Sequence, residues 1–518
     1  MKGRLASASV ISSAAALVFA STAVAQGPVL VSPTAAVGSP YAGCLASQPA
    51  QTGQNFLDAE VEPQIAVNPA NLKNMVGQWH QDRWSNAGAR GIGGAYTKTG
   101  GQSWTDTTVP YSDCAPGGLS YERASDPWVS FGPDGTAYSS AQSFDGSTNR
   151  SAVSAATSRD GGKTWGNVQT IVAYPNAQFS TDKNSTTADP VHAGVAYTVW
   201  DTLIAPTDNP DDHIHAAAYT GPAQFSKTTD GGVTWSPVQT IIGSGNRQQT
   251  IGNIIVVDPR TDTLYDFTDL IVPPNTPFQG VQSNTEVAFV KSIDQGATWS
   301  APQVIAPFNS TGVIDPNTGQ AARTGNILQE VAIDPSNGNL YLVWQASSNF
   351  AKNVKQGAST FDNEVMFTSS ANGGNTWATP TAIVGPATYP VFTPTIAVNS
   401  NGTVAVTFYD SRELSATNTT TWPTDYWVIF SKNGNASFGN EQHVAGPFNM
   451  MAAPVARGFF TGDYEGLAAV GSSFEALFIQ TNCGGFDSTS PQCARASSNT
   501  APTTNTNPTD VFSATLTP

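Results

Sequence analysis

Trp79-His80-Gln81-Asp82-Arg83-Trp84 is the densest mixture of aromatic and ionisable side chains in the sequence. A histidine can exchange a proton near neutral pH, and an arginine binds a carboxylate through a bidentate fork. We therefore expect an acidic-sugar site here, with His80 as a catalytic acid or base and Trp79, Arg83 and Trp84 contacting substrate. The alternative is that Asp82 and Arg83 pair to fix the loop, while the tryptophans pack between structural units.

Four further arginines each stand in a segment that precedes a strand-like run, which is unusual in a chain with few cations. They are Arg123, Arg247, Arg323 and Arg457. Guanidinium groups that converge on one point would bind a substrate carboxylate. The alternative is ion pairing with Asp126, Glu330 or Glu465. The sequence predicts that some of the four serve each purpose.

Metal ligands are less clearly indicated. His213 and His215 stand beside Asp211 and Asp212, a composition that suits a metal, although the run reads equally well as a long polar loop. No close Cys/His cluster predicts a metal-thiolate site. The sequence requires no cofactor, and Ca²⁺ is possible.

The elements that must position these residues are marked by a repeated turn. Ser158-Arg159-Asp160-Gly161-Gly162-Lys163-Thr164-Trp165 has copies that end at residues 104, 235, 299, 377 and 438. Asp or Asn bonds its own backbone, Gly supplies a positive φ, and the final aromatic pins the turn to a sheet. A recurring turn at this spacing predicts a repeat architecture.

Two or three short strand-like runs precede each turn and one follows it, which indicates four-stranded units in a radial array. The C-terminal runs at 467–470, 474–480 and 510–516 lack a fourth partner, and the run at 28–31 could supply it. We therefore predict an all-β, seven-bladed β-propeller, with six blades as the alternative. Residues 26–518 form one domain in this prediction. Because the turns lie on one face, we expect the chemistry on the other.

Composition and targeting signals place the chain outside the cell. Residues 1–25 read as a signal peptide with an Ala23-Val24-Ala25 cleavage motif. No later run approaches the ~18 apolar residues of a membrane span. A net charge of -16 argues against nucleic-acid binding. Sequons such as Asn184 would carry glycans only in a eukaryotic host.

Four cysteines suit an oxidising compartment. They are Cys44, Cys114, Cys483 and Cys493. We expect Cys44 to pair with Cys114 and Cys483 with Cys493, although four cysteines allow three pairings.

The turns resemble the Asp-box, or bacterial neuraminidase repeat, of sialidase-type propellers. Together with residues 79–84, 125–135 and 462–467, they make most of the mature chain similar to secreted Asp-box propellers usually labelled sialidase-like. That class includes polysaccharide lyases, among them enzymes that release terminal rhamnose from glucuronate. The resemblance implies a carbohydrate-active protein whose partner is an acidic glycan.

Three functions follow from the resemblance. The leading hypothesis is β-elimination, with His80 and Tyr464 as proton carriers and Arg83, Arg123 and Arg457 as the carboxylate clamp. A sialidase-like exo-glycosidase is the first alternative, but the Arg-Ile-Pro signature that precedes the first box in sialidases is absent. A carbohydrate-binding propeller without catalysis is the second alternative.

Overall fold

The chain is built almost entirely from antiparallel strands. The computed structural model describes residues 27–33, 37–44, 51–209, 219–245, 247–272, 285–348, 350, 361–385, 388–432, 434–435, 437–482 and 508–518. Strand-forming runs rich in Val, Ile, Thr and aromatic residues alternate with Gly- and Asp-containing turns, as expected for an all-β protein. Within these residues, no helix has the length and apolar character of a membrane span.

The strands fall into four-stranded groups that follow the chain. The first half of the chain supplies β2 (Glu60–Val67), β3 (Met75–Arg83), β4 (Ala89–Thr97) and β5 (Thr105–Val109); then β6 (Arg123–Phe131), β7 (Ala137–Phe144), β8 (Ser151–Ser158) and β9 (Gly166–Tyr174); then β10 (Phe179–Ala188), β11 (Ala196–Ile204), β12 (Ala223–Thr228) and β13 (Gln239–Ile242). The first two groups are joined by the single pairing of Ala89 with Ala124.

The second half continues the pattern. It supplies β14 (Gln249–Asp258), β15 (Thr263–Ile271), β16 (Thr285–Ser292) and β17 (Gln303–Pro307); then β20 (Gln329–Ile333), β21 (Leu340–Ser347), β22 (Asn363–Ser370) and β23 (Thr381–Val384); then β24 (Val391–Val398), β25 (Val404–Asp410), β26 (Pro423–Ser431) and β27 (Gly439–Asn449). A small sheet contains β18 (Val313–Ile314), β19 (Ala321–Arg323) and β28 (Phe459–Phe460), and η3 (Met450–Ala452) is a short 3₁₀ helix.

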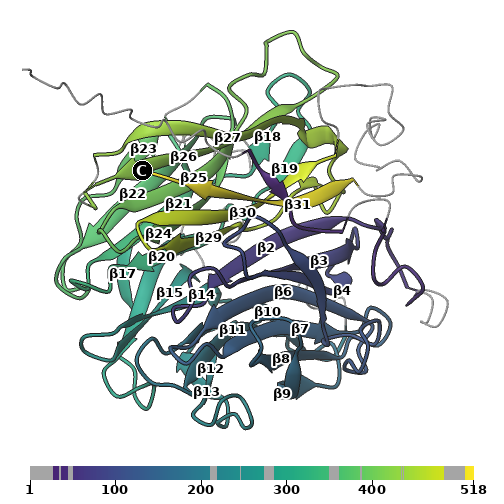
Figure 1. Cartoon of the computed structure of the whole chain (residues 1–518), viewed down its shortest axis with the longest axis vertical. Coiled ribbons are helices and arrows are strands. Elements are labelled where there is room, and N and C mark those ends of the chain that lie inside the picture. The colour runs from purple at the N-terminus through teal and green to yellow at the C-terminus, as the bar shows by residue number, and fades with distance from the viewer. Residues whose placement is uncertain are drawn as a thin grey trace, which may run out of the picture.

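The last group joins the two ends of the chain. It contains β29 (Gly466–Val470), β30 (Ser473–Thr481) and β31 (Thr509–Leu516), and β1 (Val29–Leu30) pairs with β31. The sequence analysis suggested that the run at 28–31 supplies this fourth strand, and it does. Figure 1 shows the yellow strands β30 and β31 beside the purple β2.

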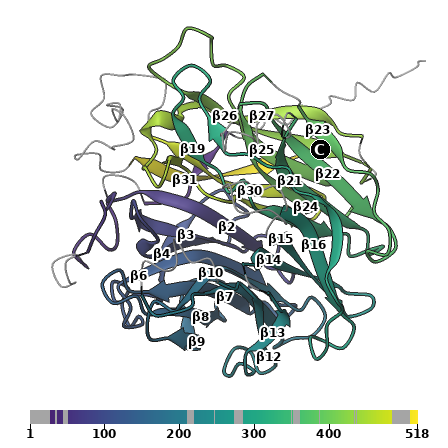
Figure 2. The same cartoon turned by 180° about the vertical axis from the view of Figure 1, so that it is seen from behind.

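The first strands of the groups contact one another in a ring. In order, these strands are β2, β6, β10, β14, β20, β24 and β29, and β29 contacts β2. Figure 2 shows β2, β6, β10, β14 and β24 of this ring from behind. Sheets placed radially around an axis in this way form a β-propeller, in which inner strands surround the centre and closure removes exposed edges.

The repeated turns join the third and fourth strands of their groups. In the turn between β8 and β9, Ser158 Oγ donates to Asp160 Oδ1 at 2.9 Å, and the Thr164 backbone N–H donates to the same oxygen at 2.9 Å. The Gly162 N–H donates to Ser158 Oγ at 2.9 Å. The small polar residue, Asp and Gly of the motif therefore satisfy one another's hydrogen bonds.

Packing between neighbouring sheets explains the rest of the motif. Trp299 packs edge-on against Phe225 of the preceding sheet at a centroid distance of 5.4 Å, and Trp377 packs against Phe289 at 5.9 Å. A Cβ at Gly296 would lie 2.5 Å from the Phe225 ring. The Gly-to-Trp spacing is therefore fixed by the sheet that precedes the turn as well as by the turn itself.

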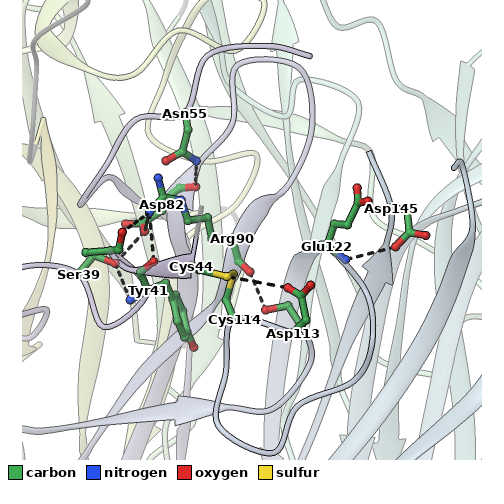
Figure 3. The surroundings of a disulfide bond; sticks show 12 residues. Ser39, Tyr41, Cys44, Asn55, Asp82, Arg90, Asp113, Cys114, Glu122 and Asp145 are labelled. Atoms are coloured by element: carbon green, nitrogen blue, oxygen red, sulfur yellow. Dashed lines mark hydrogen bonds and ion pairs between the residues drawn. A yellow bond between two sulfur atoms is a disulfide. The ribbon is translucent and has the colours of Figure 1, made fainter. Parts of the chain in front are cut away.

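Residues 37–44, which precede β2 and are called the strap below, are held by the disulfide Cys44–Cys114, whose Cα atoms lie 5.3 Å apart. This confirms the first predicted pairing; Cys483 and Cys493 lie outside the described residues. Figure 3 shows that Asp82 reaches toward this strap. Asp82 accepts from Ser39 Oγ at 2.8 Å and pairs with Arg90 at 3.3 Å. Asp82 therefore holds the strap directly through Ser39, and Arg90 holds it by donating to Tyr41 O at 3.1 Å. The alternative Asp82–Arg83 pair is not formed.

Candidate functional site

Inner strands of the propeller carry β-bulges that turn side chains toward the axis. The register shifts lie at Glu62 in β2, at Asp126 in β6 and at Lys183 in β10. These three residues have φ values of 55°, 51° and 42°, a conformation that non-glycine residues rarely adopt. Bulges re-aim side chains locally. Here they bring one cation and two carboxylates from three sheets together.

The bulge residues form a compact charge cluster. Lys183 Nζ lies 2.8 Å from Asp463 Oδ2, 3.2 Å from Glu62 Oε1 and 3.4 Å from Asp126 Oδ1. Arg323 makes a bidentate pair with Asp463, with Nε 2.9 Å from Oδ1. Burial alone would raise the pKa of Glu62, but Lys183 and His80 hold it well below its ordinary value. Burial opposes the charge of Lys183, yet Asp126, Asp463 and Glu62 raise its pKa well above the ordinary value. Glu62 and Lys183 are therefore both charged in this cluster.

His80 connects the first two sheets beneath this cluster. The Asp126 backbone N–H donates to His80 Nε2 at 2.6 Å, and Glu62 Oε2 lies 3.0 Å from the same nitrogen. The ring is fully buried. In the third sheet, Asp201 plays the same part by accepting from the Gly252 N–H of the next bulge at 2.9 Å. His80 thus holds the Asp126 bulge in place and does not face a solvent-filled space.

Glu62, His80 and Asp126 are the ligand set in this cluster that could hold a metal, since their donor atoms lie within 4.8 Å of one another. Two observations oppose this use. His80 Nε2 already lies 2.6 Å from the Asp126 backbone nitrogen and 3.0 Å from Glu62 Oε2, and the Lys183 ammonium already contacts both carboxylates. A metal ion there would have to displace the Asp126 N–H from His80 and the Lys183 ammonium from Glu62 and Asp126. His213 and His215, with Asp211 and Asp212, lie outside the described residues.

A pocket of about 500 Å³ opens from this cluster toward the loops of the second and third sheets. Its inner end is lined by Glu62, Asp126, Lys183 and Arg323, and its outer end by Phe144 and Phe179, among others. Of the residues predicted from sequence, four arginines line it: Arg83, Arg123, Arg323 and Arg457. Arg247 does not line it. Three of the four arginines that were predicted to converge, Arg123, Arg323 and Arg457, therefore line one pocket, and Arg83 joins them.

The arginines differ in what balances their charge. Arg323 is paired with Asp463, whereas Arg123 donates to uncharged oxygens, including Asn86 Oδ1 and Ala87 O at 2.8 Å each. Arg83 donates to Gly88 O at 2.5 Å. No hydrogen bond or ion pair joins Arg457 to another described residue. Burial, followed by repulsion from a neighbouring arginine, lowers the pKa of Arg83 and of Arg123 to about 10. An anion in the pocket would relieve this repulsion.

Two carboxyl groups face the same pocket. Gln142 Nε2 donates to Asp126 Oδ2 at 2.6 Å and to Asp182 Oδ1 at 3.4 Å, so these oxygens lie within about 6 Å of each other. Asp126 is buried at the pocket floor, whereas Asp182 is open to it. Burial within the site raises the pKa of Asp182 to about 6, against the lowering effect of Lys183. One carboxyl group can therefore carry a proton beside another that is paired with a cation.

The remaining predicted residues are buried and do not line this pocket. Trp79 is 1% exposed and packs in the core with Ile65 and Leu477, and its indole donates to Gln81 Oε1. Trp84 lies beneath Arg123, whose guanidinium carbon is 4.4 Å from the ring centroid. Both indoles are buried, which corresponds to the alternative that the tryptophans pack between structural units.

Tyr464 is also enclosed, beside Trp128 at a ring-centroid distance of 5.6 Å. Burial raises its pKa well above the ordinary value, and the charges of Glu62 and Asp126 raise it further. Such a phenol keeps its proton, so its surroundings do not activate it as a nucleophile.

Sequence reasoning gave no role to Glu62 or Gln142 and did not single out Asp182. One signal could have indicated the bulges. Glu62-Pro63 and Asp126-Pro127 stand at equivalent places in the first strands of their groups. Proline inside a strand is largely confined to edges and bulges.

Comparisons with known proteins assign no family. No family model matches the chain, and no curated protein matches it. Among solved structures, an α-L-arabinanase of Penicillium chrysogenum complexed with arabinobiose is 14% identical, with a TM-score of 0.43 over 70% of this chain and 94% of that one. A Dyadobacter fermentans protein of unknown function and a variant of NanB sialidase from Streptococcus pneumoniae are each 10% identical, covering 95% of this chain and 98% of theirs, with TM-scores of 0.46 and 0.43. Identities this low do not transfer an activity.

Proposed function

We propose that this protein is a secreted enzyme that hydrolyses glycosidic bonds in carboxylate-bearing glycans. The observation that carries the proposal is the pocket of about 500 Å³ that opens from the charge cluster, which we call the axial pocket. In this pocket Arg83, Arg123 and Arg457 lack carboxylate partners, and Asp126 and Asp182 face the same space. Guanidinium groups suit a sugar carboxylate, and a carboxyl group with a raised pKa next to one that is paired with a cation suits glycoside hydrolysis. Secretion rests on the N-terminal leader motif, which lies outside the described residues.

We infer that the scaffold is a seven-bladed propeller with Asp-box turns. The strand groups beginning at β2, β6, β10, β14, β20, β24 and β29 support one blade each, with β1 completing the last. The hydrogen bonds of Ser158, Asp160 and Gly162 support the Asp-box assignment of the turns. In this arrangement the turns and the pocket belong to different loop sets, because the pocket is lined by loops between other strands.

The proposed reaction uses the two carboxyl groups in different roles. Asp182, with its raised pKa, donates a proton to the glycosidic oxygen as the bond to the anomeric carbon breaks. Asp126 attacks that carbon, since its Oδ2 lies within about 6 Å of Asp182 Oδ1, a limit that includes the spacing of carboxyl groups in retaining glycosidases. Asp182 then takes a proton from water, which displaces Asp126. Lys183 stays paired with Asp126 between these steps.

The lyase hypothesis assigned the proton transfers to His80 and Tyr464. Both are buried, and neither lines the pocket. A carboxylate clamp would serve a lyase and a hydrolase equally well. Hydrolysis is preferred because its two acid–base groups lie in the same pocket as the arginines.

The test is incubation of the purified protein with rhamnose-capped glucuronate glycans such as gum arabic, and with sialosides. A matched control uses the same glucuronate glycan after chemical reduction of its carboxyl groups to alcohols. Hydrolysis releases reducing sugar from the native glycan only, without new absorbance in the unsaturated-uronate band. Appearance of that absorbance would replace the proposal with a lyase. Binding without product would leave a carbohydrate-binding propeller.

A further inference from the structure

Two phenylalanine rings at the outer end of the axial pocket belong to no hydrophobic core. Phe144 ends β7 and Phe179 begins β10, and both half-buried side chains line the pocket. Neither takes part in a hydrophobic cluster of the described residues. A ring that is only half-buried in the wall of a polar pocket offers an apolar surface to a ligand.

The positions of both rings are fixed by their neighbours. Phe179 stacks on Tyr174, with ring centroids 4.8 Å apart and 13° between the planes. A Cβ on Gly88 would lie 2.6 Å from Phe144 Cζ, so the missing side chain of Gly88 leaves room for this ring. Ser151, the strand partner of Phe144, donates through Oγ to Phe179 O at 3.2 Å and so ties the two aromatic segments together. The protein itself therefore holds the rings at the pocket wall.

Strand β10 connects these rings to the proposed acid. Side chains two residues apart point to the same side of a strand, so the exposed Ser180 and Asp182 face the same space, and both line the pocket. With a rise of about 3.3 Å per residue, Phe179 lies about 10 Å along β10 from Asp182. This span is longer than one sugar ring. A glycosidic bond held at Asp182 therefore places the next sugar beside Ser180 and Phe179.

The charged pair at the outer end is balanced within the protein. Arg150 and Asp145 line the pocket there, with Nε and Oδ2 2.6 Å apart. The Arg150 guanidinium carbon also lies 4.9 Å from the Tyr121 ring centroid. An arginine whose charge is already paired does not require an anionic ligand. Together with the two rings, this pair suits a neutral sugar that is recognised by its C–H face.

We propose that the outer end of the axial pocket is a subsite for the second sugar of the substrate, a neutral pyranose. Its apolar face stacks on Phe144 and Phe179, and its hydroxyl groups bond to Ser180. That this sugar is the leaving group rests on the proposed hydrolysis, whereas the stacking subsite does not. The preferred substrate is then an acidic sugar linked to a neutral one, and a small aglycone is a poor replacement for the neutral sugar.

The kinetic test compares sialyllactose with methyl sialoside and glucuronosyl-galactose with methyl glucuronide. Wild-type kcat/KM should be at least about tenfold higher for the longer member of the pair that is cleaved, because burial of a sugar face on an aromatic ring is favourable. Phe179→Ala and Phe144→Ala should abolish this preference. Phe361→Ala is the matched control, since it removes a phenyl ring that is 41% exposed and does not line the axial pocket. The control should keep the preference.

Binding of lactose, which has no carboxylate, separates the subsite from the proposed hydrolysis. Saturation-transfer NMR should detect lactose on the wild type, and Phe179→Ala should weaken this binding by about tenfold or more. Ser180→Ala, a change at an exposed side chain, should also weaken lactose binding without lowering Tm. Lactose binding that depends on Phe179, with no cleavage of any probe, would refute the hydrolysis and leave the subsite. The subsite is overturned if neither lactose binding nor the preference for the longer substrate changes in the two phenylalanine variants and in Ser180→Ala.

Discussion

Replacing Asp182 with Asn separates catalysis from stability more sharply than any other change in the pocket. The amide keeps the size of the side chain and can still accept the hydrogen bonds of Gln142 and the Lys183 N–H. It cannot deliver a proton. General acid catalysis contributes about 10²- to 10⁴-fold, so Asp182→Asn should lower kcat by that factor. The fall in wild-type activity above pH about 6, where Asp182 loses its proton, should be absent from the variant.

The raised pKa of Asp182 also predicts how the free energy of unfolding of the wild type changes with pH. The folded state holds the Asp182 proton more tightly than the unfolded state, so the free energy of unfolding falls as the pH rises from about 4 to about 6. A rise from about 3.9 to about 6 corresponds to at most ~3 kcal/mol. Because Asp182 is open to solvent in the pocket, we expect less than about 1 kcal/mol. At pH 7 the variant should be as stable as the wild type or slightly more stable.

The assays are reducing-sugar release from pH 4 to 8 and calorimetric melting at pH 4 and 7. Asp106→Asn is the matched control, since Asp106 is also exposed, also has a pKa raised by burial, and lies outside the axial pocket. It should keep wild-type kcat. An Asp182→Asn variant with kcat within twofold of wild type would remove Asp182 from the mechanism. A large fall in Tm at pH 7 would show that Asp182 is structural.

Three further predictions follow from the geometry of the site and the inner strands. Arg123→Ala should raise KM at least tenfold for a carboxylate-bearing glycan, because a charged hydrogen bond contributes about 1.5–3 kcal/mol. The KM for the carboxyl-reduced form of the same glycan should not change. Equal increases in KM for the two glycans would exclude a carboxylate clamp. His80→Ala should lower the free energy of unfolding by about 2–4 kcal/mol in urea titrations, because it leaves a cavity and an unpaired Asp126 N–H. An unchanged urea midpoint would contradict the conclusion that His80 holds the Asp126 bulge in place. Asp266 and Asp269 are buried without partners among the described residues, and burial raises their pKa values well above the ordinary range. The wild type should therefore lose stability as the pH rises above about 4, by up to ~1.4 kcal/mol per pH unit for each group, and changing both residues to Asn should remove this loss. An identical dependence of the free energy of unfolding on pH in variant and wild type would show that the two groups are not protonated in the fold.

The local signals in the sequence were strong because each turn satisfies itself. Ser158, Asp160 and Gly162 bond one another within one turn, so their spacing is readable without knowledge of the rest of the fold. The pairing of β1 with β31 was also predictable, since the last strands otherwise lacked a partner. Cys44–Cys114 belonged to the pairing that was expected among the three that four cysteines allow, and the structure contains this disulfide.

The site was less predictable because its residues come from different sheets. The sequence drew attention to residues 79–84, but a strand alternates its side chains between faces, and a bulge changes that alternation at one residue. Trp79 and His80 therefore became interior residues, while Arg83 reached the pocket.

The sequence by itself determined the repeated unit, the order of the strands and the recurrence of arginines next to strand-like runs. Each of these depends on residues close together in the chain. Only the tertiary structure decided which arginines meet, that Lys183 joins Glu62 to Asp463 across the axis, and that Asp126 and Asp182 share one pocket. These contacts depend on the closure of the ring, which brings together residues up to several hundred positions apart, and on bulges whose direction no local pattern specifies.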